Sequence, residues 1–363
     1  MGEVVRYGII GSGMMGLEHL RNLQAIDGAV VTAVADPHAP SRDWAVALAD
    51  EVGDDLTCFE HHGALIESGL CDAVVVASPN MTHAAILDDV LTTDLHVLVE
   101  KPMCTTLADC RRIVAAAAGR SAIVWVGLEY RYMPPVARLI DAVHRGAVGD
   151  VRMVAIREHR FPFLPKVGDW NRFNRNTGGT LVEKCCHFFD LMNHITQAEP
   201  VRVMASGAQD VNHLDERYDG EAPDILDNAF VIVDYDDGSR AMLDLCMFAE
   251  GSEHQEELSV VGSTGKVEAF LPSSEVRIGS RSGGRPGVAT ETVHDDRVAY
   301  EGFHHGSSFL EHLDLLAAIR AGRAPDVGVV DGLRSVAVGV AAHRSIAEGR
   351  AVTLAKVLAD PTA

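Results

Sequence analysis

The tripeptide Glu100-Lys101-Pro102 places a cation at the end of an apolar run from Leu95 to Val99. Because a residue before proline is pushed out of the α region, Lys101 is expected to be extended where this predicted strand ends. In an open parallel sheet, ligands bind at that carboxyl edge. A lysine there can donate hydrogen bonds to an oxygen of a bound molecule, although Lys-Pro after a strand is also an ordinary loop start.

A second set of reactive side chains lies on a predicted helix from Leu181 to Ile195, which Gly178-Gly179-Thr180 precedes. At 3.6 residues per turn, apolar residues cover most of its circumference, so the helix should be buried. The titratable residues form one narrow stripe: Glu183, His187, Asp190 and His194. Because burying an unpaired charge is costly, this stripe must be solvated, mutually paired or facing a wet cleft.

Glu183 and His187 are one turn apart within the stripe. A carboxylate beside an imidazole orients the ring and supports its protonated form, as a general base requires when it takes a hydroxyl proton. We therefore predict that this pair faces a cleft and that His194 faces solvent. Metal binding by Glu183, His187 and a cysteine is the alternative, but the sequence offers no third ligand at a recognisable spacing, and no metal site is predicted.

The start of the chain predicts a dinucleotide site. A β-rich run, Val4–Ile10, is followed by Gly11-Ser12-Gly13-Met14-Met15-Gly16 and a helical pattern. Gly11 allows the tight turn, Gly13 lets the backbone approach a pyrophosphate, and Gly16 lets the helix pack close to the strand. The phosphates would rest on the helix N-terminus, where unpaired N–H groups and the helix dipole favour an anion.

Asp36 indicates which dinucleotide binds. It ends a second predicted strand, Val30–Ala35, about 20 residues past the last glycine, where the fingerprint needs an acid for the ribose hydroxyls. A carboxylate accepts hydrogen bonds from those hydroxyls and repels a 2′-phosphate, which favours NAD over NADP. Arg42 is the alternative to weigh, because a nearby arginine could bind that phosphate; otherwise it is a solvated residue in the next helix.

Length and composition set the outer limits. With 363 residues, two domains are expected, and no apolar stretch approaches the ~20 residues of a membrane span. Met1-Gly2-Glu3 leads directly into a strand without a basic segment or cleavage site. The seven cysteines are irregularly spaced and favour reduced thiols in the cytoplasm. A net charge of −21 makes nucleic acids and anionic membranes poor partners.

The first third alternates short β runs with helical patterns, which predicts a doubly wound parallel sheet. The predicted strands are Val4–Ile10, Val30–Asp36, Asp72–Ala77, Leu95–Glu100 and Ala122–Leu128. Ser78-Pro79-Asn80 follows the third of these strands at the carboxyl edge. Asn80 and His83 could face a cofactor there, and Asn80 could equally be a helix N-cap.

From Val151 the chain changes to longer strands with turn signals and few helices, which predicts a largely antiparallel α+β sheet. The predicted strands are Val151–Phe161, Val201–Val211, Ala229–Tyr235, Ala241–Met247, Glu257–Val261 and Lys266–Leu271. A flexible loop, Gly279–Gly287, and helices near 306–321 and 328–348 follow. We divide the chain into a dinucleotide-binding domain, residues 1–128, and a second domain, residues 129–363, whose final helices are candidates to pack back on the first.

Five motifs occur in one order: the glycine loop with Asp36, Ser78-Pro79-Asn80-x-x-His83, Glu100-Lys101-Pro102, Arg131-Tyr132-x-Pro134, and Gly178-Gly179-x-Leu181-x-Glu183-x-x-x-His187. In this order they resemble the Gfo/Idh/MocA family of glucose–fructose oxidoreductase, inositol 2-dehydrogenase and rhizopine-catabolism proteins, over residues 5 to 350. The resemblance implies an N-terminal Rossmann domain and a C-terminal α/β domain whose open sheet forms homodimer or homotetramer contacts. It also implies a site between the domains for a sugar, polyol or related alcohol.

The same resemblance implies roles for single residues. Lys101 would be the catalytic lysine and His187 the base. Lys101 and Glu100 would also contact the cofactor, with Ser78, Pro79, Asn80 and His83. The chain departs from the family at Glu183, where Asp is usual, and at Lys184-Cys185-Cys186, where small or aliphatic residues are usual. The longer Glu183 puts its partnership with His187 in doubt, and the two cysteines invite either a redox role or buried packing.

Substrate contacts are predicted from side chains flanking these motifs. Tyr130 and Arg131 follow the last strand of the first domain, and Trp170 and Asn171 precede the helix with the stripe. Trp170 would suit stacking on a sugar face, with core packing as the alternative. His304 and His305, flanked by glycines, could form a substrate-side lid or an exposed loop.

Together these observations predict an NAD-dependent dehydrogenase that transfers a hydride between a sugar, polyol or inositol-like alcohol and nicotinamide. One alternative keeps NAD bound and uses transient oxidation to assist glycoside cleavage. The other is a non-catalytic dinucleotide-sensing regulator, against which the retention of Lys101 and His187 argues.

Overall fold

The computed structural model describes residues 4–360, so the N-terminal feature at Met1-Gly2-Glu3 and the last three residues of the second predicted domain lie outside the described residues. By its internal contacts the chain forms two compact units. The first holds residues up to 129 with 166–170 and 297–333, and the second holds 130–165, 171–296 and those from 334 onward. Among the described residues, no helix is long and apolar enough to cross a membrane.

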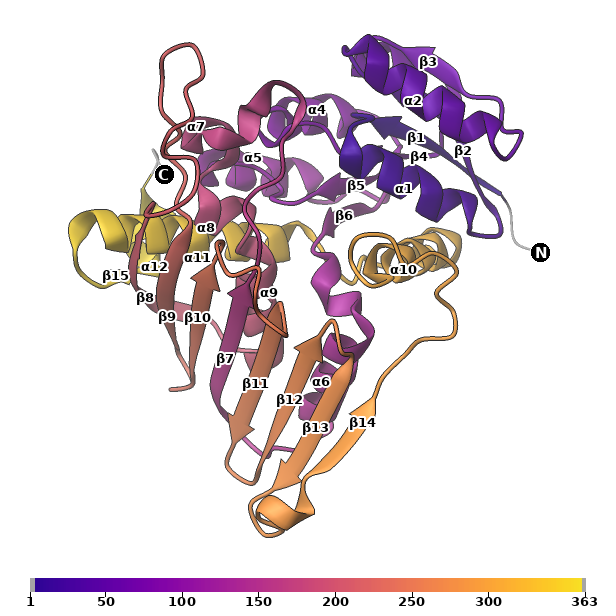
Figure 1. Ribbon diagram of the computed structural model, residues 1–363. Helices are drawn as coiled ribbons and strands as arrows, with labels where there is room; N and C mark the ends of the chain where they lie inside the picture. The colour runs from indigo at the N-terminus through magenta and orange to yellow at the C-terminus, as the bar shows by residue number, and fades with distance from the viewer. Residues whose placement is uncertain (1–3, 361–363) are drawn as a thin grey trace. The chain divides into compact units, whose positions relative to one another are not determined.

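The first unit is built on a parallel sheet, as predicted, and its six strands lie in the order β3-β2-β1-β4-β5-β6 (Figure 1). Its strands are β1 (Val5–Ile10), β2 (Ala29–Ala35), β3 (Thr57–Phe59), β4 (Ala73–Val76), β5 (His96–Glu100) and β6 (Val124–Gly127). The sequence analysis missed β3, because three residues at the sheet edge are too short to show a periodic pattern. Every residue of β4 and β6 is buried, as expected for a sheet covered on both faces.

Helices and short 3₁₀ turns complete this unit: α1 (Met14–Gln24), α2 (Ala39–Asp50), α3 (His62–Glu67), η1 (Asn80–Thr82), α4 (His83–Val90), α5 (Leu107–Ala117), η2 (Glu129–Tyr132, shared with the second unit) and α10 (Ser307–Ala321). Helix α10 packs against α1. Gly11 and Gly16 allow the first strand, loop and helix to close up. Gly11 has φ +92°, and a Cβ on Gly16 would lie 2.0 Å from the Gly11 carbonyl oxygen.

The second unit is built on a nine-stranded sheet, mostly antiparallel as predicted, in the order β14-β13-β12-β11-β7-β10-β9-β8-β15. Its strands are β7 (Val151–His159), β8 (Pro200–Ala208), β9 (Asn228–Tyr235), β10 (Arg240–Cys246), β11 (Glu256–Gly262), β12 (Gly265–Leu271), β13 (Glu275–Ser280), β14 (Ala289–Thr292) and β15 (Val352–Thr353). The predicted loop 279–287 begins inside β13, whose final Gly279-Ser280 has the composition of a loop. It contains the short turn η4 (Arg285–Gly287).

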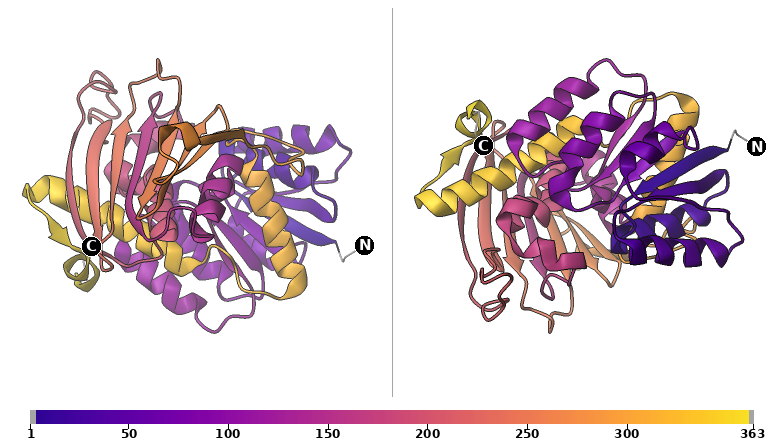
Figure 2. Two further views of the ribbon diagram at one scale, coloured as in Figure 1. Left: turned by 90° about the horizontal axis from the view of Figure 1, so that it is seen from below. Right: turned by 90° about the horizontal axis from the view of Figure 1, so that it is seen from above.

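Helices cover one face of this sheet, and the other face is open. The helical elements of the unit are α6 (Pro134–His144), η3 (Val167–Arg172, shared with the first unit), α7 (Asn174–Thr177), α8 (Thr180–Glu183), α9 (Cys186–Thr196), α11 (Val329–Glu348, shared at its start) and α12 (Leu354–Ala359). Helix α6 packs on β12 and α9 on β7, and Figure 2 shows α6 and α11 on the same side of the strands. On β9, Val231 and Val233 are therefore buried, whereas Phe230 and Ile232 are exposed.

Candidate active site

The glycine loop leaves space in front of the N-terminus of α1. Gly13 is the N-cap of α1 and has no side chain to cap it. A Cβ on Gly11 would lie 2.5 Å from the Ser78 backbone nitrogen, whereas a Cβ on Gly13 would meet nothing within 4 Å. The loop is thus tight where it packs on the chain and open where the backbone N–H groups of the helix can bind an anion.

Asp36 lies beside this loop at the end of β2. Its Oδ2 accepts a hydrogen bond from the Ser12 backbone N–H at 2.8 Å, and its Oδ1 accepts one from the His38 N–H at 2.8 Å. Arg42, on α2, donates to the backbone carbonyl of Asp36 at 2.5 Å. The structure therefore brings the loop and the predicted ribose-binding acid together, with Arg42 next to the acid.

The loop after β4 contains Ser78, Pro79 and Asn80. The Asn80 side chain is buried, and its Nδ2 has no hydrogen-bond partner among the described residues. His83 is fully buried, with ring nitrogens 2.9 Å from the Pro102 carbonyl and 3.0 Å from the Ser78 carbonyl. Burial lowers the pKa of His83, and the ring joins the loops that follow β4 and β5. Asn80 thus retains a donor for a ligand, while His83 supports the two loops.

Glu100, which precedes Lys101, contacts both α1 and the Lys101 backbone. Its Oε1 lies 2.9 Å from His19 Nε2 on α1, and its Oε2 accepts the Lys101 backbone N–H at 3.0 Å. His19 Nδ1 in turn lies 2.8 Å from Nε2 of His312 on α10. Burial alone would raise the pKa of Glu100, but the hydrogen bond from His19 and the nearby positive charges together outweigh burial, and the pKa falls to about 2. An ionised, buried carboxylate thus fixes the backbone of the candidate catalytic lysine.

A second buried carboxylate, Glu129, lies just past β6 in the same unit. Burial and the charge of Glu100 raise its pKa to about 7, while the charge of Lys101 acts in the opposite direction. The Ser308 hydroxyl donates to Glu129, and His304 Nδ1 is 3.1 Å from Glu129 Oε1. His304 therefore belongs to the charge cluster around Glu100 and Lys101, whereas the half-buried His305 has φ +55°.

Sequence reasoning missed Glu129, His19 and His312. Two of them had a signal: His19 follows Gly16 by three residues on the buried side of α1, and Glu129 follows a strand at the carboxyl edge. His312 offered none, because it meets His19 only through the packing of α10 on α1.

In the second unit the predicted helix 181–195 is two helices, α8 and α9, joined by Lys184 and Cys185. The backbone N–H groups of Lys184 and Cys185 both bond to the Thr180 carbonyl, at 3.0 and 3.3 Å. His343 on α11 accepts the Leu181 N–H at 3.1 Å and holds the start of α8. Because of this turn, Glu183 and His187 do not lie on one regular helix, so a helical wheel does not give their relative positions.

His187 is buried and stacks on Tyr130, with ring centroids 3.9 Å apart and planes at 9°. Glu183, Cys185 and Cys186 are buried as well. The structure therefore brings together Tyr130, predicted as a substrate contact, and His187, predicted as the base. The interplanar geometry fixes the orientation of the imidazole.

The two other members of the stripe, Asp190 and His194, contact side chains from other parts of the chain. Asp190 forms a bidentate ion pair with Arg131, with contacts of 2.6 and 2.5 Å. This pair engages Nε and one terminal nitrogen of Arg131, the residue predicted as a substrate contact. His194 is half-buried, and its ring meets the edge of His144 at 5.3 Å.

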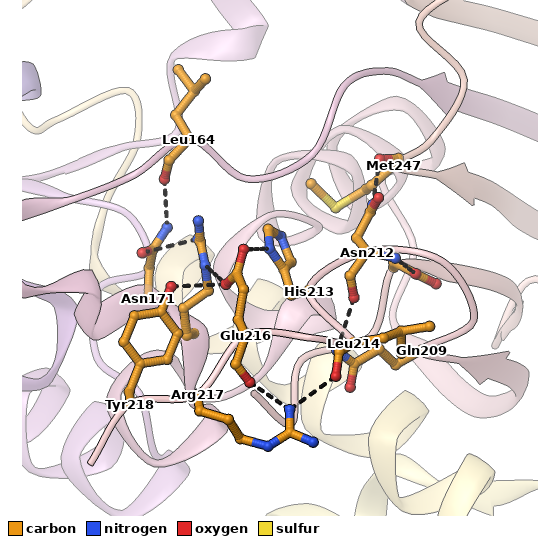
Figure 3. A network of polar contacts seen from close by, with 12 residues as sticks. Leu164, Asn171, Gln209, Asn212, His213, Leu214, Glu216, Arg217, Tyr218 and Met247 are labelled. Atoms are coloured by element: carbon orange, nitrogen blue, oxygen red, sulfur yellow. Dashed lines mark hydrogen bonds and ion pairs between the residues drawn. The ribbon is translucent and has the colours of Figure 1, made fainter. Parts of the chain in front are cut away.

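Asn171 belongs to a network of polar contacts (Figure 3). Its amide donates to the Leu164 carbonyl at 3.0 Å and accepts from Arg172 at 3.3 Å. Glu216 accepts from Arg172, His213 and Tyr218, so the network ties the loop after β8 to the loop after β7. Trp170 is half-buried within η3, in the segment assigned to the first unit. Asn171 thus holds a loop in place, whatever else it contacts.

These arrangements limit the chemistry. In residues 4–360 no three His, Cys, Asp or Glu side chains are grouped so as to hold a metal ion. The first unit offers open space at the N-terminus of α1, a fixed carboxylate at Asp36 and a lysine whose backbone is held at a sheet edge. The second offers an oriented, buried imidazole. A dinucleotide fits the first unit, because Gly13 leaves room for it and Asn80 has a buried donor to satisfy.

Comparisons with known proteins agree with this assignment. Residues 5–128 match the oxidoreductase family NAD-binding Rossmann fold, and residues 140–354 match the C-terminal α/β domain of the same family. A myo-inositol 2-dehydrogenase of Thermotoga maritima is 28% identical over 358 residues, covering 98% of this chain and 100% of the relative. Inositol 2-dehydrogenase 1 of Saccharopolyspora erythraea is 30% identical over 361 residues, covering 96% of each chain.

A solved structure gives the same result. The crystal structure of a putative myo-inositol dehydrogenase from Sinorhizobium meliloti has a TM-score of 0.78 and 26% identity, covering 97% of this chain and 100% of the other. The two domain matches together span most of the chain, in the order in which the two sheets occur. The chain belongs to the Gfo/Idh/MocA family of oxidoreductases, with an NAD-binding Rossmann fold and a C-terminal α/β domain.

Proposed function

We propose that this NAD-binding oxidoreductase oxidises one secondary hydroxyl of an inositol-like cyclic polyol. Lys101 binds the substrate oxygen and His187, supported by Glu183, acts as general acid/base. The observation that carries the proposal is the way Glu100 holds the Lys101 backbone at the carboxyl edge of the sheet, at 3.0 Å. The relatives named as inositol dehydrogenases support the substrate class.

The first unit supplies the residues that would hold NAD: the loop from Gly11 to Gly16, Asp36, and the loop with Ser78, Pro79 and Asn80. When bound, NAD supplies a hydride acceptor at nicotinamide C4. The ammonium of Lys101 donates a hydrogen bond to the substrate oxygen and stabilises negative charge on it as the proton leaves. His187 takes that proton, and the Tyr130 stack keeps its ring plane fixed while it does so.

A substrate screen tests this function. Purified protein with NAD is offered myo-inositol, scyllo-inositol, aldoses, amino sugars and glycosides, and reduction is followed at the nicotinamide absorbance. We expect the highest kcat/KM with an inositol. Binding of NAD without reduction by any panel member would support the sensing alternative. Release of an aglycone without net NADH would support oxidation-assisted glycoside cleavage.

We expect the protein to bind NAD more tightly than NADP. The Asp36 carboxylate, held by Ser12 and His38, would face the 2′-phosphate of NADP and repel it. The measurement is a fluorescence titration with both dinucleotides, on the wild type and on Asp36→Ala. The preference for NAD should fall in the variant, most clearly at low salt, because Arg42 remains. An equal or higher affinity of the wild type for NADP would assign the phosphate site to Arg42.

We also propose that the open face of the nine-stranded sheet joins two copies of the chain. Met204, Ile232 and Met242 lie side by side on adjacent strands, and Phe230 lies two residues along β9 with 61% of its surface exposed. A contiguous apolar face of this kind is costly in water and is typical of subunit contacts.

The face can be tested by adding charge to it. The double variant Ile232→Lys/Phe230→Asp should lower the mass in light scattering from that of an oligomer to that of one chain. Val52→Lys, an exposed apolar residue of the first unit, is the matched control and should leave the mass unchanged. A wild type that is already monomeric at micromolar concentration would contradict the proposal.

A further inference from the structure

A buried lysine lies next to the Tyr130–His187 stack. Lys184 is in the turn between α8 and α9 and has only 5% of its surface exposed. Its Nζ donates to the Tyr130 hydroxyl at 2.8 Å and contacts Glu158 Oε1, on β7, at 2.9 Å. The same ammonium lies 5.1 Å from the centroid of the Tyr130 ring, within range of a cation–π contact. Lys184 thus ties the turn before His187 to the sheet and to the ring that stacks on His187.

Two buried carboxyl groups support this lysine. Glu158 and Glu256 are direct partners across β7 and β11, and both are buried on the helix-covered face. Oε2 of each lacks a hydrogen-bond donor from the rest of the described chain, as two acceptors would if they share one proton. Burial and the charge of Glu158 raise the pKa of Glu256 to about 8, so Glu256 holds a proton more readily than an ordinary glutamate does.

Two cations lie beside this pair of carboxyl groups. Glu158 lies between these cations, with Lys184 at 2.9 Å and Arg160 at 3.3 Å. Burial, followed by the charge of Arg160, lowers the pKa of Lys184 from its usual range, and the two glutamates oppose this shift. Apolar residues in the same volume would usually be as stable or more stable than such a buried cluster. Stability alone is therefore a poor explanation for Lys184, and its contact with Tyr130 points to another one.

We infer that Lys184 is a positioning residue for His187: it anchors the Tyr130 ring in the stack that fixes the plane of the imidazole, and Glu158 and Glu256 hold Lys184 in place. The inference rests on the proposed role of His187 as the general base. Misplacing a reacting group by about 1 Å can cost on the order of 10²-fold in rate. Loss of the anchor should accordingly lower kcat and leave NAD binding, which depends on the first unit, unchanged.

The test uses substitutions that separate the anchor from the fold. Lys184→Met keeps the length of the side chain and removes its charge and donor. Lys184→Met/Glu158→Gln also removes the carboxylate that would otherwise be buried without its cation, so this variant should fold if the single one does not. Tyr130→Phe keeps the stacked ring and removes the tie. Lys266→Met is the matched control, because Lys266 forms an exposed ion pair with Glu268 on β12.

The kinetic arm uses myo-inositol, or the panel member with the highest kcat/KM. Lys184→Met and Tyr130→Phe should each lower kcat by about tenfold or more, with little change in the Kd of NAD, and the two together should cost little more than either alone. In a His187→Ala background, Lys184→Met should have almost no further effect. A folded Lys184→Met protein with normal kcat, or an equal loss with and without His187, would overturn the inference. If His187→Ala itself keeps full turnover, the proposed base has failed instead.

A second arm needs no turnover. With ¹³C-labelled histidine Cε1, the His187 resonance is assigned by its loss in His187→Ala. Stacking at 3.9 Å should shift it upfield through the ring current of Tyr130. In Lys184→Met/Glu158→Gln this shift should shrink and the resonance should broaden, while Lys266→Met should leave it in place. An unchanged His187 resonance in the Lys184 variants would show that the stack does not depend on Lys184 and would overturn the inference on its own.

Discussion

Lys101→Ala should keep its binding of NAD and lose most of its turnover. The glycine loop and Asp36 do not depend on the Lys101 side chain, and Glu100 binds the backbone N–H of residue 101, which alanine retains. The variant therefore removes one ammonium group and leaves the backbone contact with Glu100 intact. Removing a single donor that stabilises developing negative charge typically costs about 10²- to 10³-fold in kcat. Steady-state kinetics with the best polyol and an NAD titration measure the two effects separately.

Two further variants sharpen this result. Lys101→Met keeps the length and packing of the side chain, so it should lose as much turnover as Lys101→Ala if the charge matters. Lys356→Ala removes an exposed lysine on α12 and should behave as the wild type. A near-normal kcat in Lys101→Ala would leave Lys101 as a structural cation that offsets the charges of Glu100 and Glu129.

The dinucleotide half of the site was predictable because its requirements are local. Gly16 is required by its contact with the Gly11 carbonyl five residues earlier, Gly11 by its own positive φ, and Asp36 follows its strand directly. The support of Lys101 was not predictable in the same way. His19 reaches Glu100 from 81 residues away, and His312 reaches His19 from 293 residues away, so only the packing of α1, β5 and α10 reveals the chain of contacts. Local sequence carries no record of such pairings.

In the second unit, hydrophobic periodicity predicted a helix correctly but not the break within it. A single amphipathic helix was predicted for 181–195, and the residues are indeed helical, but a turn at Lys184 and Cys185 separates α8 from α9. No glycine or proline marks this turn. The turn contacts Thr180, at the start of α8, and Glu158, a tertiary partner on β7. Similarly, the pairing of Asp190 with Arg131 spans 59 residues, and periodicity could show only that Asp190 needed a partner.

His187→Ala should cost most of the activity, and Glu183→Ala added to it should cost little more. Groups that act as a unit have strongly non-additive effects on rate, and removing one acid–base group typically costs on the order of 10² to 10⁴. His194→Ala is the control, since it makes the same substitution on α9 at a half-buried ring that meets the His144 ring edge to face. It should leave kcat unchanged.

The pH profile gives an independent check on the same variants. A general base must be deprotonated to work, so kcat/KM of the wild type should fall as pH falls through the pKa of His187, and His187→Ala should lose this lower limb. If the effects of Glu183→Ala and His187→Ala multiply independently, Glu183 acts apart from the imidazole, as the turn between α8 and α9 allows. If His187→Ala retains turnover and the lower limb, the base lies elsewhere. Tyr130, whose hydroxyl already accepts a hydrogen bond from Lys184, and His304, beside Glu129, would then be the next candidates.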